Sequence, residues 1–132
     1  MNIIWSSLER IFINNNKQYK NYVCPNCFEK INHCQCEKTP ETLIMIDSKM
    51  QYAIKILNQK YYYTQACCEG HYNKHNLICT YIYFKRKINS CPIGWKKRGL
   101  GIYFDYNIKS KKDFAEQQKK AINNLNTWVD SL

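Results

Sequence analysis

Four closely spaced cysteines restrict the fold of this chain more than any other feature. They follow the pattern C-x2-C-x6-C-x-C within the polar stretch 21–38, at Cys24, Cys27, Cys34 and Cys36. A zinc ion takes four soft ligands in a tetrahedron, and each pair of cysteines presents two thiolates from one tight turn. Because a segment this short cannot bury a hydrophobic core of its own, metal ligation would supply its folding free energy. The spacing therefore predicts one structural Zn²⁺ held by these four cysteines.

The same cysteines also allow other interpretations. They could be free thiols in a loop, although buried structural cysteines usually sit in apolar strands rather than in an Asn-rich stretch. A redox-active pair is less favoured, because a redox C-x-x-C opens a helix in a βαβ pattern. His33 adjoins Cys34 and could replace one thiolate. Four protein ligands leave no open coordination position, which favours structural over catalytic zinc.

Further cysteines and histidines follow later in the chain. We expect the thiols to fill core positions and the histidines to lie exposed in a loop, because successive strand residues point to opposite faces and would scatter metal ligands. Cys91 is also expected to pack. A second metal site or a Cys/His nucleophile stays open as an alternative, although no third residue that would orient the histidine is evident. The residues concerned are Cys67, Cys68, His71, His75 and Cys79.

Length and composition place the chain among globular proteins. Its 132 residues suffice for one domain with a small appended module. Hydrophobic residues at 45% and charged residues at 23% argue against a disordered chain. No apolar run approaches the ~18–20 residues of a membrane-spanning helix, and the first residues lack the basic segment of a signal peptide. These features predict a cytoplasmic protein, in which cysteines serve as metal ligands, reactive thiols or packing groups rather than as disulfides.

Hydrophobic periodicity predicts an α+β fold. Residues 1–40 are expected to hold an N-terminal helix over 2–13 and the small zinc knuckle, and Thr39-Pro40 reads as a linker. Residues 41–132 are expected to form a three- to four-stranded antiparallel sheet with two helices on one face. Asp47 or Ser48 is suited to cap the first of these helices, and Ser110 with Asp113 resembles a capping box for the last. The expected strands are 43–46, 61–68, 77–84 and 100–106, and the expected helices are about 48–60 and 111–131.

Strand alternation sorts the side chains of the sheet into two faces. The apolar face carries Ile78, Ile82, Phe84, Ile102 and Phe104, which the helices should cover. The opposite face would carry Tyr81, Tyr83, Tyr103 and either Tyr61 with Tyr63 or Tyr62. Aromatic side chains on an open sheet can stack bases or anchor a protein interface. The alternative is that the N-terminal helix and the zinc module cover this second face.

The charge of the chain indicates a negatively charged partner. There are 20 Lys and Arg residues against 10 Asp and Glu residues, a formal net charge of +10. Two basic triplets bracket the loop 85–99, and such a cluster suits phosphates or an acidic protein surface. The simpler alternative is a solvated loop. The candidate partner-binding residues are Lys85, Arg86, Lys87, Trp95, Lys96, Lys97 and Arg98.

The overall character of the chain resembles a known group of proteins. The small single domain, the C-P-N-C…C-Q-C knuckle and the low-GC composition are similar to phage-encoded accessory proteins of Gram-positive hosts, most of all to zinc-containing anti-CRISPR proteins directed at a type II effector nuclease. This resemblance implies a non-enzymatic inhibitor in the host bacterial cytoplasm. It would bind the nuclease or its guide complex and block guide or target-DNA engagement.

A second resemblance is local and covers eight residues. The segment Thr64-Gln65-Ala66-Cys67-Cys68-Glu69-Gly70-His71 is similar to the T-x-x-C-S-G-R segment of tRNA wybutosine-synthesising methyltransferases of the third-step family. Here Glu69 interrupts the expected Cys-Ser-Gly run, His71 stands where that family has Arg, and no cofactor-binding glycine motif is visible. The alternatives to an inhibitor are therefore an RNA- or DNA-binding module or, further off, a tRNA-modification enzyme.

Overall fold

Two antiparallel sheets and two helices make up the part of the chain that the structure, a computed structural model, describes: residues 20–36, 43–73 and 75–132. The α+β class expected from the sequence is confirmed. The helix expected over 2–13 and the linker at Thr39-Pro40 lie outside the described residues. In chain order the elements are β1 (Lys20–Val23), β2 (Ile44–Asp47), the short 3-10 helix η1 (Ser48–Met50), α2 (Gln51–Gln59), β3 (Thr64–Cys68), β4 (Leu77–Phe84), β5 (Lys96–Arg98), β6 (Gly101–Asn107) and α3 (Lys111–Ser131).

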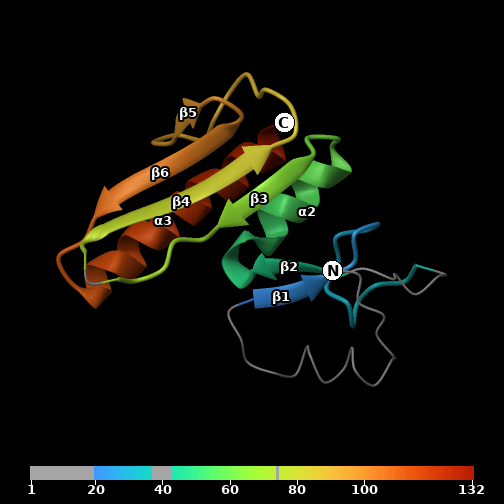
Figure 1. The fold of residues 1–132 in the computed structure, drawn as a ribbon, viewed down its shortest axis with the longest axis horizontal. Coiled ribbons are helices and arrows are strands. Elements are labelled where there is room, and N and C mark those ends of the chain that lie inside the picture. Colours follow the sequence, from blue (N-terminus) through green and yellow to red (C-terminus); the bar gives the residue numbers. More distant parts are fainter. Residues whose placement is uncertain (1–19, 37–42, 74) are drawn as a thin grey trace.

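The larger sheet has the strand order β3-β4-β6-β5, and every neighbouring pair is antiparallel. Both helices lie on one face of it, as Figure 1 shows. The core between these layers is apolar: Ile82 and Ile102 from the sheet and Leu57 and Leu125 from the helices are all fully buried. The strand alternation in the sequence therefore identified the helix-covered face correctly.

The smaller sheet joins the cysteine segment to the rest of the fold. Its strand β1 was not foreseen, and it pairs with β2 from Lys20 opposite Asp47 to Val23 opposite Ile44. Val23 is fully buried and belongs to the main core. The pairing links segments on either side of the boundary set at residue 40. The division into units 1–40 and 41–132 itself stays a prediction.

The helix ends follow the sequence only in part. Ser110 caps α3 as expected, since its Oγ accepts the Asp113 N–H at 3.1 Å while Asp113 Oδ2 accepts the Lys109 N–H at 2.9 Å. The cap expected from Asp47 or Ser48 is wrong. The chain first makes the turn η1, and α2 then starts after Met50 without a side-chain cap. The carboxylate of Asp47 instead accepts the N–H of Glu69 at 3.0 Å.

The strand expected over 61–68 begins later than the sequence suggests, because α2 ends in a Schellman motif. The Tyr62 N–H donates to the Leu57 carbonyl at 2.8 Å, and the Tyr61 N–H donates to the Asn58 carbonyl at 3.1 Å. Tyr61 occupies the left-handed position of this motif with φ 69°. Tyr61, Tyr62 and Tyr63 therefore connect α2 to β3, which starts at Thr64.

The left-handed backbone of Tyr61 predicts a stabilising substitution. A side chain in this conformation costs roughly 1–2 kcal/mol, whereas glycine adopts it freely. Tyr61 is 78% exposed, so its ring contributes little burial. We expect Tyr61→Gly to raise the free energy of unfolding by about 1 kcal/mol, measured by urea denaturation. Tyr62→Gly is the matched control and should destabilise, because Tyr62 lacks the positive φ; equal effects would contradict the assignment of the motif.

Candidate functional site

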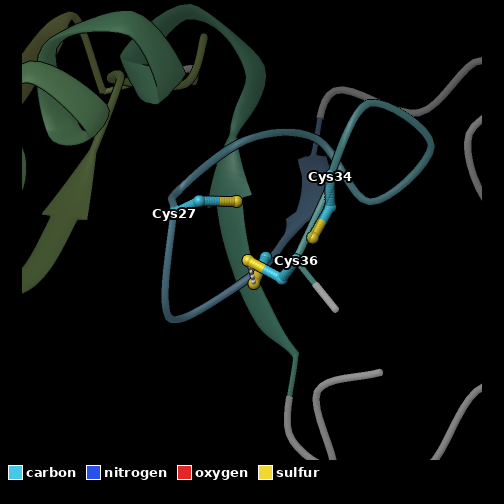
Figure 2. Close-up of side chains that lie close together, drawn as sticks. Cys27, Cys34 and Cys36 are labelled. Atoms are coloured by element: carbon cyan, nitrogen blue, oxygen red, sulfur yellow. Dashed lines mark hydrogen bonds between the residues drawn. The ribbon is translucent and has the colours of Figure 1, made fainter. Parts of the chain in front are cut away.

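The four cysteines expected to bind zinc come together. Cys24 directly follows β1, Cys27 lies in the turn after it, and Cys34 and Cys36 return on the other side of an isolated bridge between Val23 and Lys30. The four Sγ atoms lie within 4.8 Å of one another. Figure 2 shows the side chains of Cys27, Cys34 and Cys36 pointing toward one another.

Two local turns create this convergence. In the first, the Phe28 N–H donates to the Cys24 carbonyl at 2.8 Å, and the Asn26 N–H points at the Cys24 sulfur at 3.4 Å. In the second, the N–H groups of His33 and Cys34 both donate to the Lys30 carbonyl, at 2.8 and 3.0 Å. These two turns thus bring the sulfur atoms of the four cysteines close to one another.

The sulfur separations fit a metal site. Zn–S bonds of about 2.3 Å in a tetrahedron place sulfurs roughly 3.8 Å apart. The Cys24 and Cys36 sulfurs are already 3.9 Å apart, and the rest of the cluster needs only a small contraction. His33 is exposed and is not part of the cluster. The structure therefore supports a four-cysteine cluster that is compatible with a metal ion.

Three thiols of the cluster have pKa values shifted in different directions by their surroundings. Burial would raise the pKa of Cys24, but the N–H groups of Cys27 and Asn26 outweigh it and lower that pKa. Burial raises the pKa of Cys27 to about 12, and the neighbouring thiols add to the effect. The hydrogen bond with Cys34 raises the pKa of Cys36. Backbone N–H groups thus favour a thiolate at Cys24, while a cation would have to displace protons from Cys27 and Cys36.

The cysteine module packs on α2. Lys55 Nζ forms an ion pair with Glu29 Oε1 at 2.8 Å, and Gln51 Nε2 donates to the Phe28 carbonyl at 3.0 Å. Since α2 lies on the helical side of the large sheet, these contacts hold the module away from the opposite face of that sheet. The alternative in which the module covers that face is not supported by these contacts.

The outer face of the large sheet carries tyrosines and basic residues in register. The Tyr83 ring lies over Gly101, since a Cβ added at Gly101 would be 2.7 Å from the ring. A hollow of about 200 Å³ opens between the tyrosines, with Arg98 and Asp105 among its lining residues. Across β3, β4, β6 and β5 one row runs Ala66, Tyr83, Gly101 and Arg98, and the next runs Cys68, Tyr81, Tyr103 and Lys96. We call these two rows the tyrosine face. The expected grouping of Tyr81, Tyr83 and Tyr103 is confirmed. Tyr61, Tyr62 and Tyr63 instead lie in the connection between α2 and β3.

The basic residues of the expected contact site are exposed, and Trp95 is not. Lys85, Arg86 and Lys87 follow β4 directly, and Lys96–Arg98 form the edge strand β5. Arg98 pairs across β6 with the row of Tyr83, so both triplets lie at the same end of the sheet. Trp95 is only 5% exposed, and its indole N–H donates to the Ala121 carbonyl at 3.2 Å. Trp95 is a core residue between the sheet and α3, which corrects its expected role as a contact residue.

The later cysteines and histidines separate into different surroundings. Cys67 packs against the main core, and burial raises its pKa to about 12. Cys79 lies on the tyrosine face, and His75 is exposed in the loop before β4. Cys68 and His71, however, meet Asp47, with ligand atoms within 4.8 Å of one another. Asp47 was not expected in this cluster, because its position just before a helix suggested an N-cap instead.

Comparison of this chain with protein-family models, with curated proteins and with solved structures finds no match. Among the described residues, no helix combines the length and apolarity needed to cross a bilayer. What the protein does therefore has to be inferred from its own residues.

Proposed function

We propose that this chain is a non-enzymatic, zinc-stabilised binding protein that contacts its partner through the tyrosine face and the two basic triplets. The observation that carries this proposal is the hollow between Tyr81, Tyr83 and Tyr103 with Arg98 at its edge. Tyr81 and Tyr83 alternate along β4 with Ile82, which is buried in the core against the helices, so the hollow lies on the opposite face of the sheet. Zinc in the cysteine module has a structural role, holding residues 20–36 against α2.

The chemistry of this surface favours a partner that carries nucleic acid. Tyrosine rings stack on bases, and exposed Lys and Arg side chains neutralise phosphates. Tyr83 is 48% exposed, and Arg98 and Lys96 flank the rings at the edge of the sheet. A type II CRISPR effector nuclease bound to its guide RNA, the partner implied by the resemblance, offers both phosphates and bases. Occupying that surface in the host bacterial cytoplasm would block guide or target-DNA engagement sterically, since a chain of net charge +10 cannot mimic DNA.

A charge-reversal series tests the surface. Replacing Lys96, Lys97 and Arg98 together by Glu is expected to weaken binding to an effector–guide complex roughly tenfold or more, because three cationic contacts are lost. The control replaces Lys112, Lys119 and Lys120 by Glu, an equal charge change at exposed positions of α3. Affinity is measured by fluorescence anisotropy with labelled protein. If both variants lose the same affinity, β5 is not part of the contact surface.

The second candidate, a free nucleic-acid-binding module, rests on the same tyrosines and is distinguished by salt dependence. Binding to a labelled single-stranded RNA alone should fall steeply with salt and with Tyr83→Ala. An inhibitor of the nuclease should bind the effector–guide complex far more tightly than it binds that RNA. Equal affinity for both would favour the module.

A further inference from the structure

The junction between β2 and the end of β3 holds a second cluster, which shares only Cys68 with the tyrosine face. His71 Nε2 lies 3.2 Å from Asp47 Oδ2, and Cys68 Sγ joins them within 4.8 Å. A zinc site with bonds of 2.0–2.3 Å to N, O and S ligands has ligand atoms roughly 3.3–3.6 Å apart. The three side chains come from the end of β2, the end of β3 and the loop after it. Their ligand atoms lie close enough together to share one ion.

A buried polar network fixes the turn that carries two of these ligands. Gln118 Nε2 donates to the carbonyls of Glu69 and Gly70, at 3.1 and 2.8 Å, and Thr80 Oγ1 donates to the Glu69 carbonyl at 2.9 Å. Gln118 and Thr80 are 2% and 0% exposed. The Glu69 N–H in turn donates to Asp47 Oδ2. Metal ligands in proteins are oriented by such outer hydrogen bonds, and here the network holds Cys68 and His71 beside Asp47.

The charges of the cluster favour a cation. The residues Asp47 and Glu69 are only 6% and 3% exposed, and a buried carboxylate is costly without a positive charge. Lys49 Nζ is engaged by Gln118 Oε1. A divalent ion bound at Asp47 would offset the charge of that buried carboxylate.

We propose that Asp47, Cys68 and His71 form a second metal site that binds Zn²⁺ and leaves one coordination position open. The His71 side chain is 49% exposed, so solvent reaches the metal from its side, whereas the Asp47 side chain is 7% exposed. Asp, Cys and His are all established zinc ligands, and three protein ligands with an open fourth position distinguish an exchangeable site from a closed structural one. The fourth position would take water or an external donor atom. This inference goes beyond the proposed binding function and does not depend on it.

Metal stoichiometry tests the site in the full chain. Native mass spectrometry at a small excess of Zn²⁺ should find two ions per wild-type chain and one in His71→Ala. His75→Ala is the matched control, because His75 is exposed in the neighbouring loop and lies outside the cluster; it should keep two ions. Cys68→Ser should also lose one ion. One ion in both the wild type and His71→Ala would overturn the proposal.

Two further readouts separate this site from the four-cysteine cluster. Cys24→Ser should keep the ion at Asp47, so a Cys24→Ser/His71→Ala double variant should bind none. Co²⁺ in the Cys24→Ser variant should give an absorption spectrum that changes when azide is added, since azide needs an open coordination position. A spectrum that azide leaves unchanged would overturn the open position. Circular dichroism of each variant checks that it remains folded.

Discussion

Replacing Cys24 by serine is expected to release the zinc of the cysteine module and to unfold residues 20–36 while the four-stranded sheet stays folded. Apart from Val23, the module buries only a small apolar cluster around Cys24, Ile31 and Leu43. Structural zinc supplies about 10–16 kcal/mol of apparent binding free energy in zinc-finger peptides, far more than so small a cluster can. The substitution also removes the Cys24 sulfur to which the Asn26 N–H donates.

Hydrogen exchange with mass spectrometry, combined with metal analysis, measures this outcome. Amides of β1 and of the turn 24–36 should lose protection, whereas those of β4 and β6 should keep it. Cys79→Ser is the control, because it makes the same chemical change outside the four-cysteine cluster. An unchanged metal content in Cys24→Ser would refute the ligand assignment. Loss of protection throughout the sheet would instead mean that the two units fold together.

Replacing Gly70 by alanine is expected to destabilise the fold by about 2–4 kcal/mol. Gly70 has φ +83°, which disfavours any other residue. An added Cβ would also lie 2.8 Å from Thr80 Oγ1 and 2.9 Å from Ile78 Cγ2, and both residues are buried. Overpacking of this kind typically costs 1–3 kcal/mol in addition to the backbone strain. The substitution would also displace the turn that carries His71.

Gly99 supplies the matched control for Gly70. It too has a positive φ, 58°, but a Cβ there would have no heavy atom within 4 Å. Gly99→Ala should therefore cost only the conformational share, about 1 kcal/mol. Urea denaturation of both variants separates the two contributions. If Gly70→Ala costs no more than Gly99→Ala, the close packing around Gly70 does not limit stability.

The two candidate metal sites differ in how they depend on the fold. The four-cysteine cluster is built from one short segment whose turns aim the thiols locally. The Asp47–Cys68–His71 cluster depends on the junction of β2 with β3 and on Gln118 from α3. Denaturing the sheet should therefore abolish the second site first, because only the packing of β2 against β3 brings Asp47 to Cys68 and His71.

The sequence by itself determined the elements whose signals are local. The alternation of residues 77–84 predicted β4, the apolar periodicity of 111–131 predicted α3, and the spacing of Cys24 to Cys36 predicted the cysteine cluster. Each of these depends on side chains that are neighbours in the chain, so period and spacing suffice.

Only the tertiary structure decided what distant segments do to one another. Trp95 sits among basic residues in the sequence, yet the packing of α3 against the sheet buries it. The sequence position of Asp47 suggests a helix cap. Because β2 lies beside β3, its carboxylate instead accepts the Glu69 N–H and lies next to His71 Nε2. β1 carries no strong strand signal and forms because β2 is there to pair with it. The free energy of such contacts comes from partners more than 20 residues away, and no local pattern records which partner the chain will meet.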